Sequence, residues 1–280
     1  MKAWRPLAAG SAVVALALLG WAVLVEPGRV RVRTIELSLP GWPSALDGLR
    51  VAVMGDIHAG GPHGGIDKLR TLVADVNRSS PDVVVLLGDY VTPAWGTFVE
   101  PEITAEVFSS LRAPGGVVAV LGNHDWWYDG ERVRRALEAP GIVVLENEAH
   151  RVVHVGNTFW LAGLADLWTR APDIQGTLAA IPPEAPVLLL THSPDVFPDV
   201  PARVALTLAA HTHGGQVRIP PFPAPVVPSR YGSRYAAGHV IEGGRHLFVT
   251  TGVGTSIIPV RFAVPPEVVI LTLHQVQPAR

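Results

Sequence analysis

The stretch VLGNHDWWYDG, residues 120–130, runs from an apolar segment directly into Asn123, His124 and Asp125, and then into two tryptophans. A hairpin turn tolerates Asn and Gly, but it gains nothing from a His–Asp pair followed by large aromatic side chains. Four further apolar segments also stop at residue types that bind metal ions. They are LRVAVMGD (49–56), DVVVLLGD (82–89), PVLLLTHSPD (186–195) and VALTLAAHTHGG (204–215). This repeated ending favours one shared site over five separate turns.

The hydrophobic pattern predicts an α/β fold. In the first half, near-continuous apolar strands alternate with helical patterns at 66–80, 100–112 and 129–139, which is typical of a sheet buried on both faces. A Pro-rich segment at 220–238 is expected to be an exposed loop. The layout predicts a two-sheet β-sandwich flanked by helices, within one domain. Short strands are expected in the second half at 142–145, 151–154, 158–164, 246–250 and 267–273.

Polar residues at the strand ends are expected to meet, because ligands in α/β sheets bind beyond the carboxyl ends of the strands. Taken singly, a Gly-Asp after a strand is usually a turn or a helix cap, and a lone His is more often a hydrogen-bonded structural residue. Five such ends in succession instead predict one metal site. The candidates are Asp56, His58, Asp89, Asn123, His124, His192, His211 and His213.

The composition excludes several functional classes. The chain has 280 residues, 48% of them hydrophobic, and contains no cysteine, which excludes disulfides, thiolate nucleophiles and Cys-based zinc sites. Any metal must therefore be held by His, Asp, Asn or Glu. The formal net charge is −2, without clustered Lys and Arg, so we expect no nucleic-acid partner. We expect the protein to be a monomer.

An apolar segment at the N-terminus is predicted to anchor the chain in a membrane. No residue from Leu7 to Val25 is charged, and a helix of that length would span roughly 28 Å, close to the thickness of a bilayer core. A cleaved signal peptide is the alternative, although its apolar region is usually shorter. Basic residues flank both ends, which leaves open the side on which the domain lies. We expect an anchor at 1–28, a linker and first strand at 29–47, and the main domain at 48–280.

Five motifs carry a resemblance to a known family. In chain order they are GDIH, GDY, GNHD, THSPD and AHTHGGQ. Together they resemble the metallophosphoesterase (calcineurin-like phosphoesterase) superfamily over about residues 48 to 275. The later segments RYAAGHV, TTGVGTSIIPVRF and PPEVVILTL further resemble its membrane-associated bacterial branch, which includes phosphodiesterases of the cell envelope and hydrolases of UDP-diacylglucosamine. The resemblance implies a β-sandwich flanked by helices and carrying two metal ions.

The resemblance also implies roles for individual residues. A carboxylate bridge offsets the repulsion between two dications, and a water between them becomes hydroxide near neutral pH. Ligands without sulfur suit Mn²⁺, Fe or Zn²⁺, and the sequence does not choose among these. His124 would act on the phosphate oxygens or protonate the leaving group, while Asp125 would either orient His124 or cap a helix. One metal would be bound by Asp56, His58 and His213, the other by Asn123, His192 and His211, with Asp89 bridging them.

Two positions depart from the family pattern. Ala210 stands where many relatives have Gly before the His-x-His pair, a small change that we expect to be tolerated. Thr92 lies three residues after Asp89, where the protein-phosphatase branch has an Asp that supports the catalytic His. This second departure argues against protein-phosphatase activity and leaves a diesterase interpretation intact.

Weaker candidates for substrate contact lie near the strand ends and in the Pro-rich loop. Arg230 and Arg234 could clamp a second phosphate, or they could be solvated surface arginines. Asp166 could support a ligand or simply make a turn, and His63 could lie near the metal rim. Four tryptophans could line the cleft or touch lipid, with core packing as the alternative: Trp126, Trp127, Trp95 and Trp168.

These observations together predict a membrane-anchored, dinuclear metal-dependent phosphoesterase. We expect it to hydrolyse a phosphodiester or pyrophosphate bond by in-line attack of hydroxide at phosphorus, on a lipid-linked envelope substrate such as UDP-diacylglucosamine. One alternative is a broad phosphodiesterase or phosphomonoesterase acting on soluble substrates. Another is a catalytically silent envelope scaffold that keeps the metals for structure. Retention of His124, which is not needed to hold metal, argues against the scaffold.

Overall fold

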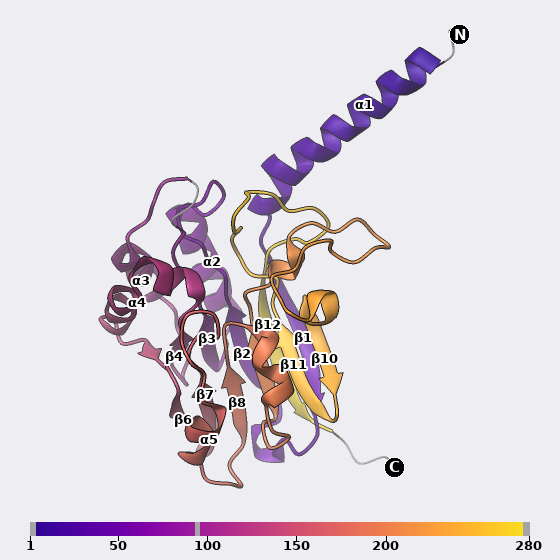
Figure 1. Cartoon of the computed structure of the whole chain (residues 1–280). Coiled ribbons are helices and arrows are strands. Elements are labelled where there is room, and N and C mark those ends of the chain that lie inside the picture. The colour runs from indigo at the N-terminus through magenta and orange to yellow at the C-terminus, as the bar shows by residue number, and fades with distance from the viewer. Residues whose placement is uncertain (1–3, 93–95, 277–280) are drawn as a thin grey trace.

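Two six-stranded sheets packed face to face form the body of the protein (Figure 1). The computed structural model describes residues 4–92 and 96–276, so Trp95 lies outside the described residues. Apolar side chains from both sheets fill the space between them, including Val51 and Val85 from one sheet and Leu188 and Leu206 from the other. The predicted two-sheet α/β sandwich is confirmed.

The first sheet carries the three strands that end in GDIH, GDY and GNHD. Strands β2 to β5 are mutually parallel, β12 runs antiparallel to β2, and β1 lies parallel to β12 at the edge. Because β2, β3 and β4 are parallel neighbours, their carboxyl ends meet at one edge of the sheet. The strand order is β1 (Arg31–Leu39), β12 (Glu267–Gln275), β2 (Leu49–Met54), β3 (Val83–Leu87), β4 (Val117–Val120) and β5 (Val143–Val144).

The second sheet carries the strands that end in the two histidine motifs. Strands β7, β8, β9 and β11 are parallel to their neighbours, whereas β6 and β10 close the two edges in antiparallel fashion. The strand order is β10 (Gly238–Glu242), β11 (Arg245–Val249), β9 (Leu206–Ala209), β8 (Val187–Leu190), β7 (Asn157–Gly163) and β6 (Glu148–His154).

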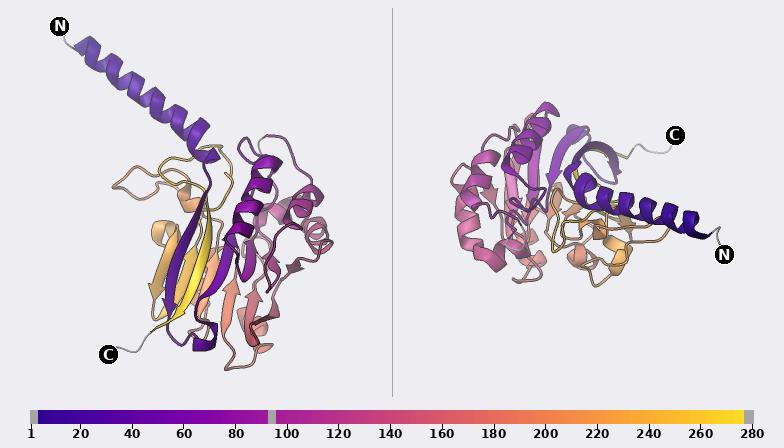
Figure 2. Two further views of the ribbon diagram at one scale, coloured as in Figure 1. Left: turned by 180° about the vertical axis from the view of Figure 1, so that it is seen from behind. Right: turned by 90° about the horizontal axis from the view of Figure 1, so that it is seen from above.

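Helices cover the outer faces of both sheets, as Figures 1 and 2 show. On the first sheet they bury an apolar layer that includes Leu69 and Val76 of α2 and Phe108 of α3. The layer outside the second sheet contains Leu178 of α5 together with Phe197 and Tyr235 from short 3₁₀ turns. The helices are α2 (Ile66–Arg78), α3 (Pro101–Phe108), α4 (Asn123–Glu138) and α5 (Ile174–Ala179), and the 3₁₀ turns are η3 (Ser44–Leu46), η4 (Pro194–Asp199), η5 (His213–Gly215) and η6 (Gly232–Tyr235).

The start of α4 differs from the sequence-based expectation of a helix at 129–139. The helix begins at Asn123, so the GNHD motif forms its first turn, and a non-helical residue at Asp129 interrupts it. Asp125 causes the early start because its carboxylate accepts a hydrogen bond from the backbone N–H of Gly122, the residue before the helix (2.9 Å). The motif therefore places its side chains on a helix rather than in a loop.

The N-terminal segment forms helix α1 (Trp4–Gly20), which continues through one π-helical turn, η1 (Trp21–Val25), and a 3₁₀ turn, η2 (Glu26–Gly28). Figures 1 and 2 show α1 projecting away from the domain. The stretch Gly10–Gly28 is long and apolar enough to cross a membrane, by length and composition. The turns η1 and η2 together form the foot of α1, residues 21–28. The foot is fixed to the domain, because Arg261 N donates to Ala22 O (3.0 Å) and Val264 N donates to Glu26 Oε1 (2.9 Å).

The packing between the sheets predicts how strongly a central side chain stabilises the domain. Leu188→Ala should lower the free energy of unfolding by about 2–5 kcal/mol, because Leu188 is fully buried between the sheets and its removal leaves a cavity. The half-exposed Ile103 of α3 is the matched control, and Ile103→Ala should cost about 1 kcal/mol or less. Denaturant unfolding followed by tryptophan fluorescence measures both. Equal losses for the two variants would contradict this description of the core.

Candidate metal centre

The carboxyl ends of strands from both sheets bring the predicted metal ligands together at one edge of the sandwich. Their ligand atoms form two groups, and within each group these atoms lie within 4.8 Å of one another. Asn123 joins the second group through a 3.2 Å contact between its Oδ1 and His192 Nε2. The first group is Asp56, His58, Asp89 and His213, and the second is Asp89, His192 and His211. All seven predicted ligands are therefore neighbours, while their roles stay predictions.

Asp89 belongs to both groups. Its Oδ2 lies 3.6 Å from His58 Nε2 and 3.3 Å from His192 Nε2. The other oxygen, Oδ1, accepts a hydrogen bond from the backbone N–H of His124 (2.9 Å), which fixes the rotation of the carboxylate. This position is the one that a bridging ligand between two ions requires.

The backbone at the site is strained in a consistent way. Left-handed φ values are uncommon for residues other than glycine and cost roughly 1–2 kcal/mol each. Such strain persists where the surrounding structure demands it, and it is concentrated at functional sites. Five of the predicted ligands have φ between 45° and 70°: Asp56, His58, Asp89, His211 and His213.

Unpaired buried atoms show that the cluster fits a cation. Among the described residues, Asp56 Oδ2 and His211 Nε2 are buried without a hydrogen-bond partner. Ring nitrogens also face each other, with His58 Nε2 at 3.2 Å from His213 Nε2 and His211 Nδ1 at 3.1 Å from His192 Nε2. Buried acceptors and imidazole lone pairs that converge in this way are costly unless a cation binds them.

Two histidines are held in the orientation that a metal ligand needs. His192 Nδ1 lies 2.7 Å from the carbonyl oxygen of Leu87, and His58 Nδ1 lies 3.3 Å from that of Val91. A carbonyl only accepts, so in both rings Nδ1 carries the proton and Nε2 faces the cluster. This backbone contact on the far nitrogen is the usual support of a metal-binding histidine.

The electrostatics of the cluster also call for positive charge. Burial raises the pKa of Asp56 to about 7 and lowers the pKa of His58 to about 4. Burial acts against the charge of His192 too, but the nearby carboxylate of Asp89 outweighs it and raises the pKa of His192. The same ion pair holds the pKa of Asp89 below its usual value against burial. A bound dication would supply the positive charge that keeps these buried carboxylates ionised.

Glycines make room for the ligands. A Cβ on Gly122 would lie 2.2 Å from Asp89 Oδ1, and a Cβ on Gly252, whose φ is +71°, would lie 2.5 Å from Asp56 Cβ. Gly55 faces Ala210, and a Cβ there would lie 2.7 Å from that of Ala210. The methyl group of Ala210 is accommodated because its neighbour is glycine.

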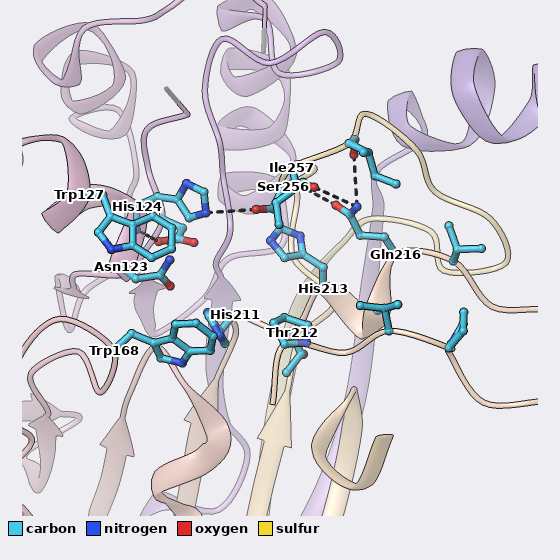
Figure 3. Close-up of a pocket in the computed structure, with 17 residues that line it drawn as sticks. Asn123, His124, Trp127, Trp168, His211, Thr212, His213, Gln216, Ser256 and Ile257 are labelled. Atoms are coloured by element: carbon cyan, nitrogen blue, oxygen red, sulfur yellow. Dashed lines mark hydrogen bonds between the residues drawn. The ribbon is translucent and has the colours of Figure 1, made fainter. Parts of the chain in front are cut away.

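His124 extends from the first turn of α4 into the cavity beside the metal-binding groups (Figure 3). Its Nε2 lies 3.1 Å from Ser256 Oγ, and its ring centroid lies 4.8 Å from those of His58 and Trp127. Burial lowers the pKa of His124. The ring is thus held next to the cluster, with one nitrogen directed at a hydroxyl group that substrate could replace.

Asp125 does not orient His124, and its predicted catalytic role is corrected here. Its two oxygens accept hydrogen bonds from the backbone N–H groups of Asp89 (2.8 Å), Tyr90 (2.8 Å) and Gly122 (2.9 Å). His124 Nδ1, by contrast, has no hydrogen-bond partner among the described residues. Asp125 therefore caps α4 and holds the Asp89 loop against it, which is the second of the two roles considered above.

An apolar cavity of about 360 Å³ lies over the metal-binding groups (Figure 3). Gln216 anchors the loop on one side of it, because its Oε1 accepts from Ser256 N (2.7 Å). No role is predicted from the sequence for Gln216 or Ser256, although they lie in the motifs AHTHGGQ and TTGVGTSIIPVRF. The cavity's apolar wall includes Trp127, Trp168, Val226, Ile257 and Ile258.

The predicted substrate contacts fare differently. Arg234 is paired with Glu242 through two hydrogen bonds (2.6 and 2.7 Å). Arg230 is exposed, with its Nε 3.6 Å from Asp195, and Trp126 packs under the guanidinium of Arg170 (4.3 Å). Among the described residues that line the cavity, Arg230, Arg234 and Trp126 do not occur. The three side chains therefore do not line the cavity in this structure, and their contact with substrate stays a prediction.

The other weak candidates from the sequence occupy different places in the structure. Trp127 and Trp168 do line the cavity. Asp166 accepts hydrogen bonds from Trp168 N (3.1 Å) and Thr169 N (2.9 Å), so it makes a turn. The carbonyl oxygen of His63 accepts from Lys68 Nζ (2.8 Å), beside the foot of α1. The rim of the cavity is therefore aromatic and aliphatic rather than basic.

Comparison with known proteins gives consistent matches. The family model described as calcineurin-like phosphoesterase matches residues 49–215. The uncharacterized metallophosphoesterase YkuE of Bacillus subtilis is 31% identical over 91% of this chain and 89% of its own length. Phosphodiesterase YaeI of Escherichia coli is 35% identical over 70% of this chain and 72% of its own. UDP-2,3-diacylglucosamine pyrophosphatase LpxG of Chlamydia trachomatis is 26% identical over 90% of this chain and 91% of its own.

The shared position of Asp89 leads to a direct test. Asp89→Asn should lower both the metal content and the rate of diester hydrolysis, because one neutral amide cannot offset two dications. We expect kcat to fall by at least about 10²-fold, more than is typical when only a supporting contact is lost. Metal analysis and a bis-p-nitrophenyl phosphate assay measure the two effects.

The control for this variant is Asp129→Asn, which removes a carboxylate from the exposed side of α4. It should change neither metal content nor rate. An Asp89→Asn protein with two bound metals and normal kcat would show that Asp89 does not bridge.

Proposed function

The chain belongs to the calcineurin-like phosphoesterase family, and from that premise we propose that it hydrolyses phosphodiester or pyrophosphate bonds of lipid-linked substrates at a membrane. Members of this family are phosphoric ester hydrolases that use two divalent metal ions, and the Asp/His clusters could hold them. The observation that carries the proposal is the apolar cavity over those clusters. A soluble nucleotide would gain little from such walls, whereas an acyl chain would bury against them.

The proposed division of labour at the site follows from where each side chain lies. The metal ions, when bound, supply a hydroxide nucleophile and neutralise charge on the phosphate. Seven buried side chains would hold them, with Asp89 between the two groups. His124 would contact the phosphate or the leaving oxygen, since it is next to the cluster and points into the cavity. Ser256 would give way to substrate, because its hydroxyl occupies the contact at His124 Nε2.

The names of two relatives support the choice of bond. YaeI is named a phosphodiesterase and LpxG a pyrophosphatase of UDP-2,3-diacylglucosamine. Both bonds join a phosphorus to an oxygen leaving group that a proton donor can assist. For this chain we propose a substrate of the same kind, whose lipid part contacts Trp127 and Ile257.

Helix α1 is proposed to be the membrane anchor. Its exposed side chains include Val13, Leu16 and Leu19, and an apolar surface of this length is stable in lipid rather than in water. At its foot, the guanidinium of Arg29 lies 5.3 Å from the ring of Trp21, which is 39% exposed. Tryptophan and arginine side by side are typical of the membrane–water interface. The anchor would therefore end where the catalytic domain begins.

The proposed role of His124 separates metal binding from chemistry. His124→Ala should leave both metals bound and lower kcat by roughly 10²–10⁴, the usual size of a general-acid contribution. The loss should be smaller for p-nitrophenyl esters, whose leaving group needs little protonation, than for alkyl esters. Metal analysis together with kinetics on both ester classes measures this.

Two outcomes would change the interpretation. An equal loss for both ester classes would assign His124 to the phosphate oxygens rather than to the leaving group. Unchanged kcat in His124→Ala would exclude a catalytic role for His124, whereas the absence of metal-dependent hydrolysis by the native protein would favour the catalytically silent scaffold.

The proposal that the substrate is lipid-linked is tested by deleting helix α1 without its foot. Residues 1–20 should be deleted and not 1–28, because the contacts of Ala22 and Glu26 fix the foot to the domain. Hydrolysis of a soluble diester should stay nearly unchanged, since every proposed ligand lies beyond residue 55. Hydrolysis of a lipid phosphoester presented in vesicles should fall by about tenfold or more through lost local concentration.

Both activities should be measured on one preparation, with metal content as the folding control. If the truncated protein keeps both activities equally, α1 gives no advantage on a substrate in a membrane, and the argument from anchoring to a lipid substrate fails.

A further inference from the structure

Two loops at the cavity expose an unusual number of large apolar side chains. The first, residues 217–228, leads from the His-x-His motif into the Pro-rich segment, and the second, residues 254–260, follows β11. Solvent reaches between 49% and 73% of each of five side chains: Ile219, Phe222, Val226, Ile257 and Ile258. An exposed apolar patch of this kind marks a surface that contacts another apolar phase.

Hydrogen bonds hold the two loops together as one unit. Gln216 Nε2 donates to Ser256 O (3.1 Å) and to Ile258 O (3.3 Å), while its Oε1 accepts from Ser256 N (2.7 Å). At the base, Arg218 N donates to Phe262 O (2.8 Å). These hydrogen bonds fix the two loops to each other below their exposed apolar side chains.

The same unit holds the foot of α1. Arg261, directly after the second loop, donates its backbone N–H to Ala22 O (3.0 Å), and Val264 N donates to Glu26 Oε1 (2.9 Å). Figures 1 and 2 show α1 leaving the domain on the side where these loops lie. A helix that enters a bilayer from this foot would bring the loops to the surface of that bilayer.

Charge on this side fits a membrane of anionic lipid. The segments 200–241 and 243–266 contain no Asp or Glu. Arg29 and Arg31 near the foot and Arg218 in the first loop are exposed. Arginines beside apolar loop tips are attracted to anionic headgroups at the membrane surface.

We propose that the loops 217–228 and 254–260 form a second membrane-contacting surface, which docks the mouth of the cavity onto an anionic bilayer beside α1. The proposal rests on the proposed anchoring of α1 and adds a surface that the helix alone does not require. Docking would place the cavity of about 360 Å³ against the lipid phase. A lipid-linked phosphoester could then reach the metal centre without its acyl chains crossing water.

The absence of cysteine from the sequence allows a direct test on the full chain. Single cysteines at Ile219, Phe222 and Ile257 would carry a nitroxide spin label, with the protein reconstituted in vesicles of phosphatidylglycerol and phosphatidylcholine. Leu16→Cys on the exposed face of α1 reports on the anchor. Val155→Cys, in the turn between β6 and β7 at the other end of the domain, is the aqueous control. Collisions with oxygen, which concentrates in lipid, and with a water-soluble nickel chelate give the depth of each label.

We expect the ratio of oxygen to nickel collisions at Phe222, Ile219 and Ile257 to be several-fold higher than at Val155. The difference should shrink in vesicles of phosphatidylcholine alone if the arginines contribute. Ile219→Cys and Phe222→Cys lie outside the cavity lining, so unchanged hydrolysis of a soluble diester shows that they fold. Metal content serves the same purpose for Ile257→Cys.

The outcomes distinguish the docking surface from the proposed function. Lipid-like values at Leu16 with aqueous values at all three loop positions would overturn the docking surface and leave the anchor standing. Aqueous values at Leu16 as well would overturn both. Lipid-like values at the loops without hydrolysis of any lipid phosphoester would keep the surface and reject the proposed substrate.

Discussion

The burial of Asp89 between two sets of histidines is the constraint on which the site depends. A carboxylate without solvent is costly unless positive charge compensates it, and Asp89 Oδ2 faces His192 Nε2 (3.3 Å) and His58 Nε2 (3.6 Å), where a bound cation would do so. Asp125 and the backbone of His124 hold this carboxylate in place, and Gly122 leaves the space that it fills. The polar ends of strands from two sheets can surround such a group only if the sheets face each other.

Besides sharing the ligands that line it, the cavity is coupled to the metal centre through a chain of hydrogen bonds. Gln216 follows the His213 motif and binds the backbone of Ser256, whose hydroxyl contacts His124. His124 in turn lies in the first turn of α4, which is capped by Asp125, and Asp125 also holds the Asp89 loop. A shift of the loop carrying Ser256 would therefore change the hydrogen bond at His124 Nε2. The side chains of Gln216 and Ser256 thus connect the apolar loops to His124.

The fold and the grouping of the candidate ligands at one edge could be predicted from the sequence because both are repeated signals. Buried strands are continuous apolar runs, and five of these runs stop at candidate metal ligands. The contacts of single side chains could not be predicted in this way. From the sequence, Arg234 is a candidate for binding a phosphate. In the structure it is hydrogen-bonded to Glu242, eight residues later. Asp125 reads as a partner of its neighbour His124, whereas its partners are backbone groups brought close by folding. Ser256 meets His124 across 132 residues, and no local pattern reports such a contact.

The link between helix α1 and the Asp/His clusters depends on one buried arginine, Arg261. The guanidinium of Arg261 donates to the carbonyl oxygens of Thr251 (2.7 Å), Gly254 (2.6 Å) and Val264 (3.1 Å), and its Nη2 lies 3.4 Å from His213 Nδ1. Burial lowers the pKa of Arg261 to about 10, so the group stays charged at neutral pH. Its donors shape the loop whose backbone holds the foot of α1. The position of α1 relative to the Asp/His clusters is thus set by a fully buried side chain and the loop around it.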